Sequence, residues 1–163
     1  MVVKNIDIID LKNILNAALN EFYQNDAKYL LAVKGMEQAC VFRLGLYMQN
    51  IMNKQPALSA LNLDCEYNKC FNQPKTTPRH TRRARPDLII HKRNLNPNKP
   101  NNENIMVIEF KGYWNKNIKS DIEKLEDFTS CICGYHYKLG AFVCLNKTDF
   151  EIRYYKEGEQ LYE

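Results

Sequence analysis

Apolar side chains recur every three or four positions in the first third of the chain, which is the spacing of a helix with one buried face. A first stripe predicts a helix over about residues 7–24, and its members are Ile8, Leu11, Leu15, Ala18 and Phe22. A second stripe predicts a helix over about residues 27–53, ended before Pro56, and its members are Val33, Glu37, Cys40, Leu44, Tyr47, Met48 and Ile51. Glu37 thus places a carboxylate on an otherwise apolar helix face.

From residue 61 the period approaches two, which is typical of a half-buried strand. Leu63, Cys65 and Tyr67 would share one face of this strand, with polar residues between them. The runs 88–90 and 105–110 are almost wholly apolar and predict two buried strands. An Asn- and Pro-rich stretch, 94–104, predicts an irregular, exposed connection between them.

The last third of the chain predicts one helix followed by two strands. Ser120 and Glu123 have capping-box spacing, so we expect a helix over about residues 121–133, ended by Gly134. The segments 139–145 and 150–155 are β-compatible. The predicted order is α-α-β-β-β-α-β-β, an α/β fold with a mixed sheet flanked by helices.

Length and composition limit the class of protein. A chain of 163 residues with 45% hydrophobic and 26% charged residues is typical of one folded domain, so we expect a single domain over residues 1–163. These values disfavour disordered, collagen-like and coiled-coil proteins. No stretch reaches the ~20 apolar residues of a membrane span, and Asp7 interrupts any secretion signal. We therefore expect a cytoplasmic protein without a membrane partner.

Positive charge is concentrated in one segment, although the formal net charge is only +4. The segment 75–85 contains no acid, and its phosphate-binding candidates are Lys75, Arg79, Arg82, Arg83 and Arg85. Such a segment favours nucleic acid as a partner through contacts to the phosphate backbone. A solvated basic loop without a partner is the alternative interpretation.

The six cysteines are Cys40, Cys65, Cys70, Cys131, Cys133 and Cys144. In a cytoplasmic protein we expect them to be free thiols. Cys131, Cys133 and His136 could contribute to a structural zinc site, but the chain contains no CxxC pair. A zinc-dependent regulator is therefore a minor alternative.

The residues with the clearest potential for chemistry lie on the two buried strands. Asp87 opens the first of these strands, and Glu109 and Lys111 lie on one face at the end of the second. Adjacent strands would bring Asp87 and Glu109 together, and a divalent cation bound through oxygen would relieve their repulsion. Mg²⁺, with Mn²⁺ as a substitute, is the expected ion, and the backbone carbonyl of Phe110 is a further candidate ligand. Alternatively, Glu109 and Lys111 form a surface ion pair while Asp87 caps a turn.

The segments Arg85-Pro86-Asp87-Leu88-Ile89-Ile90 and Val107-Ile108-Glu109-Phe110-Lys111 resemble the PD-(D/E)xK nuclease superfamily, which has the restriction-endonuclease-like fold. The resemblance implies an αβββαβ core over about residues 30–145, with an extra N-terminal helix and a C-terminal strand. It also implies that Asp87 and Glu109 bind magnesium and that Lys111 orients or activates the attacking water. Glu37 fits the further acid that members place on the helix before the first strand.

These observations predict a metal-dependent nuclease that hydrolyses phosphodiester bonds, with DNA as the substrate that the resemblance implies. Two copies could act as a homodimer when both strands of a duplex are cut. The alternative is an inactive nuclease-fold module that binds nucleic acid or a protein.

Four neighbouring residues have two possible roles each. Asp121 and Lys124 could face the site, although a helix-dipole role for Asp121 and solvation of Lys124 are favoured. Tyr113 and Trp114 could stack on an unpaired base, although packing in a turn is more usual.

Overall fold

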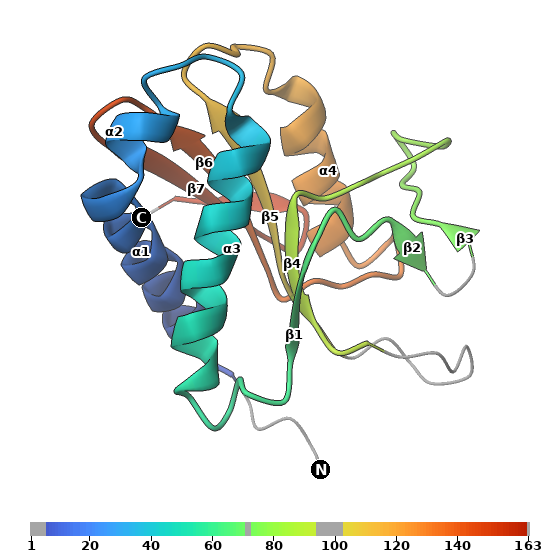
Figure 1. Ribbon diagram of the computed structural model, residues 1–163. Helices are drawn as coiled ribbons and strands as arrows, with labels where there is room; N and C mark the ends of the chain where they lie inside the picture. The colour runs from blue at the N-terminus through green and yellow to red at the C-terminus, as the bar shows by residue number, and fades with distance from the viewer. Residues whose placement is uncertain (1–5, 71–72, 94–102, 163) are drawn as a thin grey trace.

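The computed structural model describes residues 6–70, 73–93 and 103–162, and it shows a mixed β-sheet with helices on both faces (Figure 1). Helices α1 (Ile8–Asn25) and α3 (Glu37–Asn53) cover one face, and α4 (Lys119–Thr129) covers the other. The predicted mixed α/β class is therefore confirmed.

In the described residues the main sheet has the strand order β1-β4-β5-β6-β7-β8. Its strands are β1 (Asn62–Cys65), β4 (Leu88–His91), β5 (Asn104–Gly112), β6 (Leu139–Leu145), β7 (Phe150–Lys156) and β8 (Glu159–Leu161). Neighbouring strands are antiparallel except β5 and β6, which are parallel and connected through α4. A separate two-stranded ladder, which the sequence patterns do not predict, joins β2 (Lys69–Cys70) and β3 (Gln73–Pro74).

Alternation along the strands divides the core into two layers. Ile90 and Ile108 pack with α1 and α3, whereas Ile89 and Val107 pack on the opposite face with α4. The side chains of both layers are almost fully buried, which explains why the runs around residues 88–90 and 105–108 are apolar at every position. From Val107 onward the odd-numbered residues of β5 lie on the α4 face, and this alternation places Glu109 and Lys111 on that face as well. Ile105 packs with the other layer, because the register of β4 and β5 shifts at this point.

The predicted continuous helix over residues 27–53 is wrong. Helix α2 (Ala27–Leu30) ends after one turn, and α3 begins only at Glu37. Between them Gly35 has φ +88°, a conformation that an α-helix does not contain and that glycine adopts without strain. As a result Val33 is exposed instead of lying on a buried face, and Glu37 is the first residue of its helix.

The helix predicted over residues 121–133 is shifted towards the N-terminus. It begins at Lys119 with no side-chain cap, because Ile118 occupies the N-cap position. Ser120 lies inside the first turn, where its hydroxyl contacts the ring of His80. The helix ends at Thr129, before Gly134, since Ser130 has an extended backbone. Strand β1 is also shorter than predicted, because Glu66 has φ +49° and turns the chain away from the sheet.

The predicted connection 94–104 lies outside the described residues except for its last two positions. Asn104 is the first residue of β5, and its buried amide donates to the carbonyl of Tyr135. In the described part of the chain, none of the helices has both the length and the apolar composition needed to cross a membrane.

Two leucines on α3 test whether this helix is held by its packing on the sheet. Leu44 is 0% exposed and Leu46 is 40% exposed. We expect Leu44→Ala to lower the free energy of unfolding by about 2–5 kcal/mol, because it leaves a cavity in the core. Leu46→Ala should cost less than about 1 kcal/mol. Urea denaturation of both variants measures the difference, and equal costs would contradict the packing of α3 described here.

Candidate active site

Asp87 and Glu109 are brought side by side at the margin of the sheet by the pairing of β4 with β5. Leu88 is paired with Ile108 in antiparallel register, so the residue before Leu88 comes opposite the residue after Ile108. The Oδ2 atom of Asp87 accepts a hydrogen bond of 2.8 Å from the backbone N–H of Phe110. This bond fixes the Asp87 carboxylate next to Glu109, on the side of the sheet that α4 covers.

Lys111 and Glu37 meet at the end of β5. The Nζ atom of Lys111 lies 3.9 Å from Oε1 of Glu37, and Oε2 of Glu37 accepts a 2.9 Å hydrogen bond from the backbone N–H of Gly112. Because Glu37 begins α3, the break after α2 determines where this carboxylate lies. The sequence predicts Glu37 in the middle of a helix, and that position would not direct its carboxylate towards the end of β5.

Two residues of α4 complete the cluster, in contrast to the roles favoured from the sequence. Asp121 is buried, with Oδ2 2.8 Å from Nζ of Lys111 and Oδ1 3.0 Å from Nζ of Lys124. Lys124 also donates to Oε2 of Glu109 at 2.7 Å, and only 12% of its side chain is exposed. One sequence feature could have identified both residues as part of the site. They are three residues apart on a helix that directly follows the motif of Glu109 and Lys111.

We define the acid–lysine cluster as Glu37, Asp87, Glu109, Lys111, Asp121 and Lys124. If all six groups are ionised, four carboxylates and two ammonium groups leave a formal charge of −2. One divalent cation would balance this charge.

The pKa values in the cluster reflect an excess of buried negative charge. Burial raises the pKa of Asp87 to about 6, and the nearby carboxylates Glu37 and Asp121 act in the same direction. Burial and the charge of Asp87 hold the pKa of Glu109 well above its usual range, although Lys124 opposes the shift. The Oε1 atom of Glu109 is buried and has no hydrogen-bond partner among the described residues. The site therefore favours the uptake of a proton or a cation.

The residues present fit a hard divalent cation held by few protein ligands. Mg²⁺ is commonly bound by one or two carboxylates and completes its shell with water or phosphate oxygens. Asp87 and Glu109 provide such a pair, and the unpartnered Oε1 of Glu109 is available to an ion. Within residues 6–70, 73–93 and 103–162, however, no group of three or more His, Cys, Asp or Glu side chains is placed to hold a metal ion. Glu37 and the Phe110 carbonyl therefore remain predicted ligands.

The cysteines do not form a protein-only zinc site in the described part of the chain. All six are free, and none belongs to a group of side chains placed to hold a metal ion. The structure therefore gives no support to the zinc alternative.

The basic segment differs from the predicted exposed loop, beginning with Lys75. This lysine is buried, and its Nζ donates to the hydroxyl of Tyr137 at 2.9 Å and lies over the ring of Tyr67. Burial lowers the pKa of its ammonium group to about 8. Lys75 is therefore a core residue, and its predicted exposure to phosphate is corrected.

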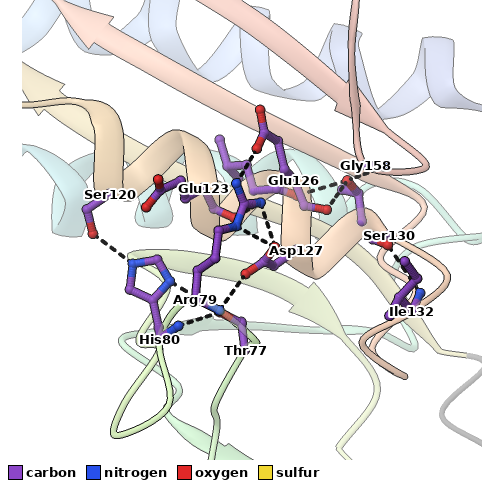
Figure 2. Close-up of polar contacts among 12 residues, drawn as sticks. Thr77, Arg79, His80, Ser120, Glu123, Glu126, Asp127, Ser130, Ile132 and Gly158 are labelled. Carbon is purple, nitrogen blue, oxygen red and sulfur yellow. Dashed lines mark hydrogen bonds and ion pairs between the residues drawn. The ribbon is translucent and has the colours of Figure 1, made fainter.

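Arg79 fastens the basic segment to α4 (Figure 2). Its guanidinium group donates to Asp127 at 2.9 Å, to Glu126 at 2.8 Å and to the carbonyl of Glu123 at 3.0 Å. These contacts neutralise Arg79, so its main role is to hold the loop and not to face a partner.

Three further arginines lie at the surface of this segment, where the side chain of Arg79 is itself 40% exposed. Arg82, Arg83 and Arg85 are exposed, and Arg85 lies 3.1 Å from a carboxylate oxygen of Glu66. Of these three, Arg85 lines a cleft of about 330 Å³, whose lining residues are Glu37, Gln38, Val41, Phe42, Cys65, Glu66, Arg85 and Asp87. One arginine of the basic segment therefore shares this cleft with Glu37 and Asp87 of the acid–lysine cluster.

Trp114 packs within the protein, as favoured from the sequence. It contacts the core between the sheet and α1 and α3, and its ring meets Tyr113 edge-on with centroids 5.0 Å apart. A side chain at Gly112 would collide with this ring, since an added Cβ would lie 2.3 Å from it. The glycine next to Lys111 thus allows Trp114 to cover the strand end.

No family model, curated protein or solved structure matches this chain. The function of this chain is therefore inferred from the geometry and electrostatics of the site.

The raised pKa of Asp87 predicts how the metal-free protein responds to pH. Between the ordinary value of 3.8 and about 6, the folded state retains a proton that the unfolded chain releases. The contribution of Asp87 to stability is thus greatest at acidic pH and is lost as the pH rises through about 6. We therefore expect the Tm of Asp87→Asn minus that of wild type, both in EDTA, to increase as the pH is raised from about 4 to 7.

Thermal unfolding followed by circular dichroism at several pH values measures this difference. Asp149→Asn is the control, because Asp149 is exposed and distant from the cluster in sequence, and its difference from wild type should stay constant. A Tm difference for Asp87→Asn that does not change with pH would contradict the electrostatic description of the site.

Proposed function

We propose that this protein is a metal-dependent nuclease of the PD-(D/E)xK superfamily that hydrolyses phosphodiester bonds in DNA. The observation that carries this proposal is the pair of adjacent carboxylates, Asp87 and Glu109, at the sheet margin, with raised pKa values and one unpartnered buried oxygen. The order α3-β1-β4-β5-α4-β6 supports a restriction-endonuclease-like core, since it has the αβββαβ arrangement of that fold once the small β2–β3 ladder is set aside.

Five residues of the acid–lysine cluster have a role in this proposal. Asp87 and Glu109 would hold Mg²⁺, which when bound lowers the pKa of its water ligand and stabilises the charge that develops on the phosphate. Lys111, fixed by Asp121 at 2.8 Å, would orient the attacking water and offset negative charge on the phosphate. Glu37 would accept a hydrogen bond from that water or from the hydration shell of the ion.

The substrate would reach the site along the exposed arginines. Arg82, Arg83 and Arg85 directly precede Asp87, so a phosphate backbone bound by them would pass the acid–lysine cluster. Contacts of this kind are electrostatic and independent of base sequence.

A second candidate function is favoured by the contact between Lys124 and Glu109. A lysine ammonium at 2.7 Å already neutralises the carboxylate that a metal would need. This contact would suit a module that binds nucleic acid or a protein without turnover. Binding of DNA without strand scission in Mg²⁺ and in Mn²⁺ would favour this second function.

Cleavage of plasmid, single-stranded DNA and RNA in Mg²⁺, Mn²⁺ or EDTA tests the nuclease directly. We expect activity that depends on a divalent cation and is lost in Asp87→Ala and in Glu109→Ala, because each change removes a metal ligand. Glu151→Ala, which removes an exposed carboxylate on β7, should retain wild-type activity. Unchanged cleavage in both site variants, with circular dichroism showing a native fold, would refute the assignment.

The exposed arginines should control affinity through their charge. We expect Arg82→Ala and Arg83→Ala each to reduce the slope of log K against log salt by about 0.9, because each removes one phosphate contact with duplex DNA. Lys54→Ala, beyond the far end of α3, should leave the slope unchanged. Fluorescence anisotropy in EDTA at several salt concentrations measures binding without cleavage. An unchanged slope in both arginine variants would place the nucleic acid elsewhere.

A further inference from the structure

The ammonium group of Lys124 is bound to Glu109, the carboxylate that the proposed metal ion requires. Its Nζ atom lies 2.7 Å from Oε2 of Glu109, 3.0 Å from Oδ1 of Asp121 and 3.5 Å from the backbone carbonyl of Arg85. The Glu109 side chain is 1% exposed, so this ammonium group is its main source of compensation for burial. Without a partner, a buried carboxylate would be strongly destabilising.

A divalent ion and this ammonium group cannot both remain close to Glu109 without a large cost. Mg²⁺ binds oxygen at about 2.0–2.1 Å, which would bring it close to an ammonium group bound to the same carboxylate. Repulsion between the two cations is strong where water is largely excluded. The free Oε1 of Glu109 offers the ion a first contact that does not require Lys124 to leave beforehand.

Asp121 offers Lys124 a second partner. It lies one helical turn before Lys124 on α4 and already contacts its Nζ, so the lysine can leave Glu109 without losing every negative partner. The other oxygen of Asp121 holds Lys111 at 2.8 Å. One buried carboxylate therefore contacts both lysines of the cluster.

We propose that Lys124 is a resident cation that neutralises Glu109 in the metal-free protein and withdraws towards Asp121 when a divalent ion binds. This inference rests on the proposed function, because it takes Glu109 as a metal ligand. The exchange makes the metal-free fold stable and weakens metal affinity relative to an uncompensated pair of acids. It also leaves a second ammonium group beside Lys111, at the place where a phosphate would bind.

Metal affinity and thermal stability test the inference without using activity. Lys124→Met retains an unbranched apolar side chain but removes the charge. We expect its Kd for Mn²⁺, measured by calorimetry at pH 7, to be at least tenfold lower than that of wild type. Its Tm in EDTA should be lower than that of wild type, and the rise in Tm with saturating Mn²⁺ should be larger.

Two control variants separate charge at this position from charge in general. Lys119→Met removes an 85% exposed lysine from the same helix and should leave the Kd unchanged. Lys124→Arg keeps the positive charge and should bind Mn²⁺ with an affinity within threefold of wild type. If Lys124→Met does not fold in EDTA, Lys124→Gln provides the same comparison, and folding rescued by Mn²⁺ would support the inference.

The outcomes distinguish this inference from the proposed function. Mn²⁺ binding to wild type that is lost in Asp87→Ala, together with equal or weaker binding in Lys124→Met, would overturn the role of Lys124 and leave the metal site intact. No Mn²⁺ binding by wild type, Lys124→Met or Lys124→Gln would overturn the metal site and the inference together.

Discussion

The burial of Glu109 is the constraint on which the rest of the site depends. A carboxylate with 1% exposure lies in a strand whose neighbours are apolar, and the charge of Asp87 beside it adds to the cost. Such a group must be protonated, paired or bound to a cation. The contact with Lys124, the raised pKa of Glu109 and the proposed binding of a divalent ion all follow from this one placement.

Helix α4 connects the chemistry of the site with the packing of the fold. Its Leu125 and Phe128 pack on the sheet, while Asp121 and Lys124 meet the polar end of β5. Arg79 binds the same helix nearer its C-terminal end, through Asp127. The loop that carries the exposed arginines is therefore held in register with the acid–lysine cluster, so both parts of the proposed substrate path depend on one element.

Sequence patterns identified the buried strands and the acids on them. Residues 88–90 and 105–108 are apolar on both faces, and the alternation of side chains between the two faces depends only on neighbouring positions in the strand. The same patterns gave wrong helix boundaries where the backbone leaves a regular helix. The stripe across Val33 and Glu37 continued through Gly35, although a glycine with positive φ ends the helix there. Ser120 was predicted as the cap from its spacing to Glu123, and this local spacing cannot show that the helix begins one residue before it, at Lys119.

The sequence by itself determined the mixed α/β class, the adjacency of Asp87 and Glu109, and the face shared by Glu109 and Lys111, since each follows from periods within one or two neighbouring strands. Only the tertiary structure decided that Lys75 is buried beneath tyrosines, that Arg79 is held by α4, and that Lys124 lies on Glu109. These outcomes depend on which charges meet across elements distant in the chain. Desolvation and pairing at such contacts have no counterpart in a local pattern of hydrophobic and polar residues.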